Sequence, residues 1–176
     1  MDDADRPGDG PLLAEVRRAR TSDVRGIRAL VDTYAPQRAL LSKATVTLYE
    51  DVQEFFVAAD GAQVVGCGAL HVMWEELAEI RTLAVTPSVR GMGVGAALLE
   101  RLVEHARALG VRRLFCLTFE VDFFARHGFV PVADAVVSPR IEAELLRSAD
   151  EGVAEFLDLE RVKPNTLGNT RMMLSW

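Results

Sequence analysis

The chain has 176 residues, 49% of them hydrophobic, which is enough to form a domain with a buried core. Its formal net charge of −6 argues against a nucleic-acid partner bound through a basic surface, but not against an anionic small ligand in a local cationic pocket. Two isolated cysteines, Cys67 and Cys116, with no C-x-x-C or His/Cys cluster, predict neither a metal site nor a disulfide framework.

The N-terminal part predicts a leader, a strand and a helix. Residues 1–11 are rich in aspartate, glycine and proline and are expected to be a disordered leader to a single domain, residues 12–176. The leader lacks the regions of a signal peptide, and no apolar run reaches the roughly 18 residues of a membrane span, so we expect a cytoplasmic protein with no membrane partner. The sequence AEVRRA (14–19) predicts a strand, and TSDVRGIRALVDTY (21–34) a helix that Pro36 ends.

The middle of the chain predicts a hairpin followed by a strand and a long helix. Residues 38–52 predict a loop and a second short helix. Residues 54–72 hold two β-rich runs around the sequence ADGA, which is typical of a hairpin. The sequence AEIRTLAV (78–85) predicts a fourth strand, ended by Pro87. A glycine-rich loop then opens a helix that Gly110 ends, with an apolar stripe at Val94, Leu98, Leu102, Val103, Ala106 and Leu109.

The C-terminal part continues the alternation of strands and helices. A fifth strand is predicted at 112–119, a short helix at 121–129 and a sixth strand at 129–132. The sequence SPRIEAELLRS (138–148) begins like a helix, and 170–176 predicts a last strand. This order of elements predicts a mixed α/β fold.

Two phosphate-binding patterns overlap in TPSVRGMGVGAALLE, residues 86–100. From Gly91 to Ala96 the sequence reads G-x-G-x-x-A, a weak dinucleotide-binding fingerprint. From Arg90 to Gly95 it reads R-x-x-G-x-G, a pattern typical of an acyl-CoA pyrophosphate loop. Both patterns place backbone N–H groups at the start of a helix, so the glycines alone do not decide between them.

The surroundings of this loop favour acyl-CoA. A dinucleotide fold has its first glycine directly after a strand, whereas Pro87 and its neighbours intervene here and at least three strands come before. Glu120, at the end of the next strand, fits a ribose-binding acid, so the dinucleotide interpretation stays open, as does a purely structural glycine-rich helix start. The loop residues expected to hold the cofactor are Arg90, Gly91, Met92, Gly93, Val94, Gly95 and Ala96.

The order of the motifs resembles that of the GCN5-related N-acetyltransferase (GNAT) superfamily. The strand EIRTLAV, the loop, a helix, a strand and FARHGF (124–129) follow one another within residues 14–132. The resemblance implies acetyl-CoA as co-substrate and a GNAT fold, with a central mixed, twisted sheet of about six to seven strands and helices on both faces. It also implies that strands 4 and 5 splay apart, and that the pantetheine arm bonds along strand 4 at Leu83, Ala84 and Val85.

The fourth strand also carries two charges. Strict alternation places Glu79 and Arg81 on one face together with Leu83 and Val85, and Thr82 on the other face. Charges inside a central strand are costly unless they are paired or functional. A structural Glu79–Arg81 pair and a general-base role for Glu79 are both open, with Arg81 tuning the base or contacting an anionic substrate and a backbone N–H near Leu83 as oxyanion donor.

The general acid is less clear. The superfamily often has a tyrosine where this chain has Phe124, and phenylalanine cannot donate a proton. The Thr118 hydroxyl, at the end of the fifth strand, can hydrogen-bond a departing thiolate, although a structural role is equally open. The absent tyrosine also leaves open a non-catalytic acyl-CoA sensor.

Four segments resemble the short, kinase-free N-acetylglutamate synthases, with the likeness covering residues 15–174. They are LLSKATVTLYEDVQEFFVA, VVGCGALHVMWEELAEIRTLAV, RLFCLTFEVDFFARHGF and VAEFLDLERVKPNTLGNTRMML. This resemblance implies direct transfer of the acetyl group to the α-amine of L-glutamate, the first step of arginine biosynthesis. Glu79 falls at the position of the base and Thr118 at that of the proposed acid, while Lys43 falls where a cation meets a substrate carboxylate.

Glutamate carries two carboxylates, so its pocket needs at least one cation and several hydrogen-bond donors. The candidates are Lys43, Arg81, Lys163 and Arg171, with Asn169 and Thr170 as neutral donors in the segment that, by this resemblance, closes the glutamate site. Gly168 stands where longer family members have an arginine, so the form of the carboxylate clamp is open. Also open are another amino acid or small amine as acceptor, the oligomeric state, with a homodimer as one alternative, and whether residues 133–160 form an interface or a lid.

Overall fold

The computed structural model describes residues 14–37, 43–133, 137–166 and 168–176, so the expected leader at 1–11 lies outside the described residues. The strands are β1 (Glu15–Arg18), β2 (Phe55–Asp60), β3 (Gln63–Trp74), β4 (Leu77–Val85), β5 (Arg113–Thr118), β6 (Val130–Pro131) and β7 (Thr170–Ser175). The α-helices are α1 (Val24–Tyr34), α2 (Thr45–Glu50), α3 (Val94–Ala108), α4 (Val121–Arg126), α5 (Pro139–Leu145), α6 (Glu151–Phe156) and α7 (Lys163–Thr166).

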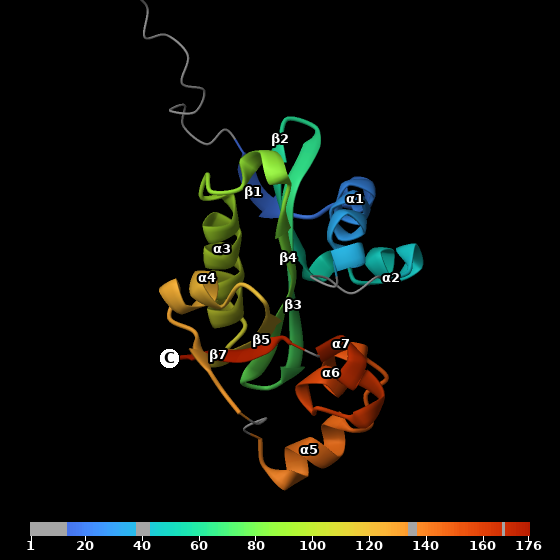
Figure 1. Ribbon diagram of the computed structural model, residues 1–176, viewed down its shortest axis with the longest axis vertical. Coiled ribbons are helices and arrows are strands. Elements are labelled where there is room, and N and C mark those ends of the chain that lie inside the picture. The colour runs from blue at the N-terminus through green and yellow to red at the C-terminus, as the bar shows by residue number, and fades with distance from the viewer. Residues whose placement is uncertain (1–13, 38–42, 134–136, 167) are drawn as a thin grey trace, which may run out of the picture.

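All of these strands belong to one mixed sheet with the order β1-β2-β3-β4-β5-β7-β6. The β4–β5 pair is parallel and the other pairs are antiparallel. Helix α3 crosses over between the two parallel strands, as a parallel pair requires. Helices α3 and α4 lie on one face of the sheet, and α1, α2, α6 and α7 lie on the other (Figure 1). The prediction of a mixed sheet with helices on both faces is therefore confirmed.

Two hydrophobic clusters fill the layers above and below the first strands. On one face, Leu98, Leu102 and Ala106 of α3 are fully buried against β2, β3 and β4. On the other face, α1 packs against β2 and β3 through residues such as Ile27. The apolar stripe predicted for α3 is therefore correct along the helix. It fails at Leu109, which follows the last helical residue, Ala108, and is 52% exposed.

Strands β4 and β5 separate soon after they begin. They pair only between Leu77–Glu79 and Arg113–Phe115, and they diverge beyond these residues. On the other side of β4, Thr82 and the residue after it lie opposite a single residue of β3, Gly68, which is a β-bulge. Thr82 has φ +52°, a left-handed conformation that costs a non-glycine residue about 1–2 kcal/mol. The predicted splay of strands 4 and 5 is confirmed.

The bulge overturns one prediction about the two faces of β4. Strict alternation would put Leu83 and Val85 on the face of Glu79 and Arg81. Instead, Leu83 and Val85 pack against the α3 cluster, because the extra residue at Thr82 inverts the alternation for the rest of the strand. Only the first half of β4 follows the simple period.

The C-terminal segment differs most from the prediction. Helix α5 begins as expected, with the Ser138 hydroxyl accepting a hydrogen bond from the Ile141 amide, but α6 was missed. The sixth strand is shorter than predicted, at Val130–Pro131. Residues of α5 and α6 form a third hydrophobic cluster on β4, β5 and β7, in which Phe115 and Phe156 pack edge to face at 5.0 Å. Within the described residues, this segment is thus a cover over the end of the sheet.

The close approach of α1 to the sheet predicts the effect of Gly26→Ala. A Cβ at this position would lie 2.6 Å from the Cβ of Val64 on β3, too close for any real contact. We expect the change to lower the unfolding free energy by about 1–3 kcal/mol through overpacking, although alanine is the better helix former by about 1 kcal/mol. Urea denaturation measures the difference. In a Val64→Gly background, which removes the Cβ that the new methyl group would meet, the same change should cost less, and an equal cost in both backgrounds would contradict the contact.

Candidate active site

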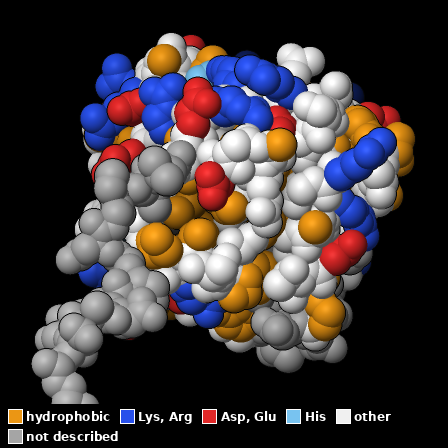
Figure 2. Space-filling model, turned by 90° about the horizontal axis from the view of Figure 1, so that it is seen from above, with side chains coloured by type: hydrophobic (Ala, Val, Ile, Leu, Met, Phe, Trp, Pro, Cys, Tyr) orange, Lys and Arg blue, Asp and Glu red, His pale blue; other side chains and the backbone are white. Residues whose placement is uncertain are grey.

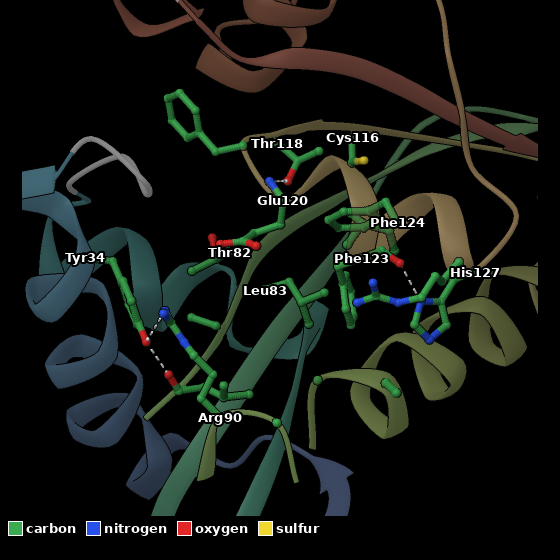
Figure 3. Close-up of a pocket in the computed structure, with 18 of the residues that line it drawn as sticks. Tyr34, Thr82, Leu83, Arg90, Cys116, Thr118, Glu120, Phe123, Phe124 and His127 are labelled. Atoms are coloured by element: carbon green, nitrogen blue, oxygen red, sulfur yellow. Dashed lines mark hydrogen bonds between the residues drawn. The ribbon is translucent and has the colours of Figure 1, made fainter. Parts of the chain in front are cut away.

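The separation of β4 and β5 opens a cavity of about 700 Å³ between the two strands, α3 and α4. Figure 3 shows its walls, with Leu83 of β4 between Arg90 on one side and Phe123 on the other. The residues that line it are Tyr34, Ile80, Thr82, Leu83, Ala84, Val85, Val89, Arg90, Gly91, Gly93, Gly95, Ala96, Cys116, Leu117, Thr118, Phe119, Glu120, Phe123, Phe124, Arg126 and His127.

The glycine loop and the start of α3 form one end of the cavity. Gly91 and Gly93 have φ +81° and +84°, and Gly93 is the residue immediately before the helix. The first N–H groups of a helix have no partner within it, and the helix dipole favours a negative charge at that position. A Cβ at Gly95 would reach Phe123 across the cavity at 3.6 Å. This end of the cavity is suited to a phosphate group.

Tyr34 connects this loop to the end of β4. Its hydroxyl donates a hydrogen bond to the carbonyl of Val85 (2.5 Å) and accepts one from Nη2 of Arg90 (3.4 Å), as Figure 3 shows. The Arg90 guanidinium also lies 5.8 Å from the centre of the Tyr34 ring. Since α1 carries Tyr34, the orientation of the loop arginine depends on a helix that precedes it by more than fifty residues.

The opposite wall is formed by the end of β5 and by α4. The Thr118 hydroxyl, which is buried, accepts a hydrogen bond from the Glu120 amide at 2.8 Å (Figure 3). Phe124 is also buried and packs edge to face against Phe123 at 5.2 Å. The position of the superfamily's tyrosine is therefore an apolar part of the wall, and Thr118 is the hydroxyl near the open end of β5.

Glu79 and Arg81 lie on the face of β4 that α6 covers. Both are buried, and Nε of Arg81 donates to Oε2 of Glu79 at 2.6 Å. The guanidinium also donates through both terminal nitrogens to Asp150, which precedes α6. Burial alone would lower the pKa of Arg81, but the two carboxylates outweigh burial and raise it. The pair predicted from the sequence is thus a triad that includes Asp150.

A further buried carboxyl, Glu155, lies on α6 close to this triad. Its exposure is 7%, and within the described residues its Oε1 is buried without a hydrogen-bond partner. Burial, and next the charge of Glu79, raise the pKa of Glu155 to about 7, with Arg81 acting in the opposite direction. Glu155 therefore holds its proton more tightly than an ordinary glutamate.

The other predicted substrate residues lie apart from the cavity lining. The Lys43 ammonium lies 3.8 Å from Asp51, and its carbonyl accepts a hydrogen bond from Arg28. Arg171 donates to the carbonyls of Glu155 and Phe156 at the end of α6.

The C-terminal strand brings two more of the predicted residues near the cavity. Thr170 pairs with Thr118 in the sheet, so it lies beside the proposed acid, and Asn169 directly precedes it. Lys163, by contrast, is exposed and pairs with Glu160 at 2.9 Å.

The structure therefore divides the predicted residues into those that line the cavity and those that lie apart from it. The cavity lining includes Thr118 and the expected cofactor residues of β4 and the loop, except Met92, which is exposed, and Val94, whose side chain is in the core. It does not include Glu79 or Arg81. Sequence reasoning missed Tyr34, Arg126 and His127 as lining residues. No local pattern marks Tyr34, because α1 reaches the cavity only through tertiary packing. Arg126 and His127 lie within FARHGF, which established the order of the motifs but was not assigned to a wall of the cavity.

The surface has local basic regions despite the net charge of −6. Seen from the top of Figure 1, Lys and Arg side chains gather along one edge of the molecule, and hydrophobic side chains are exposed on the same face (Figure 2). In the described part of the chain, no cluster of three or more His, Cys, Asp or Glu is arranged to hold a metal ion. Among the described helices none is both long and apolar enough to span a membrane.

Comparison with known proteins identifies relatives along most of the chain. Residues 25–129 match the model of the Acetyltransferase (GNAT) family. A protein of Mycobacterium tuberculosis named amino-acid acetyltransferase is 57% identical over 162 residues, which are 90% of this chain and 92% of that protein.

Two solved structures share the fold. The crystal structure of Rv2747 from Mycobacterium tuberculosis, in complex with CoA and NLQ, has a TM-score of 0.89 at 56% identity, covering 92% of this chain and 99% of that one. N-acetylglutamate synthase from Neisseria gonorrhoeae, complexed with coenzyme A and N-acetyl-glutamate, has a TM-score of 0.73 at 23% identity. In the second case the match covers 92% of this chain but 35% of that one, and the likeness concerns the fold alone.

The position of Tyr34 predicts the effect of Tyr34→Phe on binding of coenzyme A. The change keeps the ring against Arg90 and removes the hydroxyl that joins Arg90 to Val85. We expect binding of coenzyme A to weaken by about 3- to 10-fold, the loss of one or two hydrogen bonds. Isothermal titration calorimetry measures this, with exposed Tyr49→Phe as the matched control. Equal affinities of Tyr34→Phe and wild type would contradict the proposed link.

The raised pKa of Glu155 predicts a pH-dependent effect of Glu155→Gln on stability. As pH rises from about 4.5 towards 7, the unfolded chain loses this proton before the folded protein does, so a contribution to stability present at low pH is lost. We expect the unfolding free energy of the variant, relative to wild type, to rise by about 2–3 kcal/mol between pH 5 and 8. Urea denaturation across this range measures it, with Glu151→Gln on the same helix as the control. A constant difference would show that Glu155 is not buried as described.

Proposed function

The chain belongs to the GNAT family of acetyltransferases and is an amino-acid N-acetyltransferase, and on this premise we propose that it transfers the acetyl group of acetyl-CoA to the α-amine of L-glutamate. Residues 12–176 act as one acetyltransferase domain in this proposal. The observation that carries it is the combination of a cavity between β4 and β5 that suits coenzyme A with a buried carboxylate, Glu79, on the face of β4 opposite α3.

The donor occupies the cavity between β4 and β5. Its pyrophosphate lies at the loop from Arg90 to Ala96, where helix N–H groups and the arginine offset its charge. The pantetheine arm follows Leu83, Ala84 and Val85, which lie beyond the residues of β4 that pair with β5; of these, the Val85 carbonyl is bonded to the Tyr34 hydroxyl. The M. tuberculosis relative at 56% identity was solved in complex with CoA, which supports acetyl-CoA as the co-substrate.

The acceptor amine approaches the thioester from the side of Glu79. An ammonium must lose a proton before its nitrogen can attack, and Glu79 accepts that proton directly or through one water. The nitrogen then bonds to the thioester carbon, and a tetrahedral oxyanion forms. In the proposal, a backbone N–H at the Thr82–Leu83 bulge stabilises that oxyanion, because a bulge disrupts the ladder locally and both residues line the cavity.

The reaction ends with the loss of coenzyme A. The carbon–sulfur bond breaks, and the second proton of the nitrogen passes to the departing sulfur, so that coenzyme A leaves as the free thiol and the product is an N-acetylated amino acid. The Thr118 hydroxyl accepts a hydrogen bond from the Glu120 amide, which leaves its own hydrogen to donate to the departing thiolate. No covalent intermediate with the protein is required.

The substrate carboxylates are held by residues around Glu79. In the proposal Lys43 binds one carboxylate, exchanging its 3.8 Å contact with Asp51 for the substrate, and Asn169 and Thr170 add neutral donors beside Thr118. Arg81 and Arg171 were also expected to contact the substrate. The Arg81 guanidinium bonds to Glu79 and Asp150, and the Arg171 guanidinium bonds to the end of α6. We therefore propose that both arginines hold α6 in place beside Glu79.

The acceptor is tested by coenzyme A release. Purified protein with acetyl-CoA and a thiol reagent should release free thiol when L-glutamate is added, faster than with any other of the twenty amino acids or a common polyamine. Mass spectrometry identifies the N-acetylated product. Faster release with a different amine would replace glutamate as the acceptor, and binding of acetyl-CoA without release from any amine would favour a non-catalytic sensor.

The base is tested by Glu79→Gln. This change keeps the size of the side chain and an oxygen that Arg81 can contact, but it removes the group that accepts the proton. We expect kcat to fall by about 100-fold or more with little change in the KM for acetyl-CoA. Exposed Glu75→Gln, in the turn before β4, is the matched control. Wild-type kcat in Glu79→Gln at every pH from 6 to about 9 would show that another group is the base.

A further inference from the structure

Arg81 is held by carboxylates at both ends of its guanidinium group. Nε donates to Oε2 of Glu79 at 2.6 Å, and Nη1 donates to Oδ2 of Asp150 at 2.9 Å. Nη2 donates to Oδ1 of the same aspartate, so the contact with Asp150 is bidentate. A bidentate arginine–carboxylate pair fixes the plane of the guanidinium as well as its position. The direction of the bond from Arg81 to Glu79 therefore depends on where Asp150 lies.

Asp150 is itself fixed by α6. It is the residue before the helix, and its Oδ1 accepts a hydrogen bond from the Val153 amide at 2.9 Å. Two residues later, Gly152 leaves room for the guanidinium, since a Cβ there would lie 2.6 Å from Cζ of Arg81. The start of α6 thus accommodates Arg81 in two ways. The Asp150 carboxylate binds the guanidinium, and the absence of a side chain at Gly152 leaves space for it.

The charges around Asp150 support this arrangement. Burial alone would raise the pKa of Asp150, but its hydrogen bonds from Arg81 and the charge of Arg81 lower it to about 2. Asp150 is therefore ionised throughout the neutral range. The other titratable groups facing it are His71 of β3, whose Nε2 lies 3.9 Å from Oδ1, and Glu155 of α6, while Glu54 lies 2.8 Å from the other ring nitrogen of His71.

We propose that Asp150 is a positioning residue for acetyl transfer, acting through Arg81 to hold the carboxylate of Glu79 in the direction from which it accepts the substrate proton. Gly152 has the same role by leaving space for the guanidinium. The inference rests on the proposed base function of Glu79, and it gives residues 133–160, longer than a minimal acetyltransferase needs, a part in catalysis. Asp150 touches neither substrate nor cofactor in this account.

The first test is Asp150→Asn. Asparagine is as good a helix N-cap as aspartate, so α6 keeps its start, but the charged bidentate contact with Arg81 is lost. We expect kcat to fall by about 10- to 100-fold, the usual effect of a misplaced catalytic group, with the KM for acetyl-CoA unchanged. Because Asp150 stays ionised, the loss should be the same at every pH from 6 to about 9. Glu151→Gln, next in the chain with an exposed carboxylate bonded to Arg161, should keep wild-type kinetics.

The second test changes no charged group. Gly152→Ala should displace Arg81 and reproduce the fall in kcat, although alanine is favoured over glycine within a helix by about 1 kcal/mol. A variant that is as stable as wild type and has lost kcat supports positioning, whereas one that is more stable with full kcat contradicts it. If one variant does not fold, the other still tests the proposal, because Asp150→Asn removes a charge whereas Gly152→Ala adds a methyl group.

A spectroscopic readout separates this inference from the choice of acceptor. In ¹H–¹⁵N spectra that record arginine Nε–H groups, the signal lost in Arg81→Lys identifies Arg81, and it should shift in both Glu79→Gln and Asp150→Asn. An unshifted signal in Asp150→Asn, or wild-type kcat in that variant with whichever amino acid the wild-type protein acetylates, overturns the inference. If glutamate is not that amino acid, the proposed acceptor is wrong, but the comparison with the true acceptor still decides the role of Asp150.

Discussion

β4 and β5 run parallel but pair only between Leu77–Glu79 and Arg113–Phe115. Beyond these residues, each strand has one backbone edge that the other no longer satisfies, and the cavity lies between those edges. Buried N–H and C=O groups need partners, so a ligand with amide groups along its length is favoured in this gap. The sheet therefore supplies the cofactor site through an interruption of its own hydrogen-bond ladder.

The bulge at Thr82 divides β4 into two parts with different tasks. Before it, Glu79 and Arg81 face α6, and after it, Leu83 and Val85 face α3 and the cavity. The positive φ at Thr82 costs about 1–2 kcal/mol. In return, the bulge allows β4 to place an acid on one face and an apolar wall on the other within a few residues. The buried thiol of Cys67 donates to the Thr82 carbonyl at 3.4 Å and helps to hold the bulge.

Much of the fold could be predicted from the sequence, because its signals are local. Gly91 and Gly93 were marked by their spacing, and both adopt the positive φ that glycine tolerates. Thr82 carried no such signal, since a β-branched residue is among the least expected at positive φ, and so the faces of β4 were assigned wrongly beyond it.

The site was predictable only where its residues lie close together in the chain. The contacts of Arg81 with Asp150 and of Arg90 with Tyr34 join residues 69 and 56 positions apart. No sequence period relates such residues, and only the packing of α6 and α1 on the sheet brings them together. The prediction accordingly found Glu79 and Arg81 as a pair but missed the aspartate that completes the triad.

The central claim is that the donor and the acceptor meet across β4, with coenzyme A on the α3 side and the amine on the side of Glu79. A crystal structure with a bisubstrate compound, in which coenzyme A is joined through an acetyl carbon to the nitrogen of glutamate, tests this directly. We expect its pantetheine between β4 and β5, and its nitrogen within hydrogen-bond reach of Glu79, at about 3 Å or through one water. A nitrogen on the α4 side, against Phe124 and away from Glu79, would contradict the account.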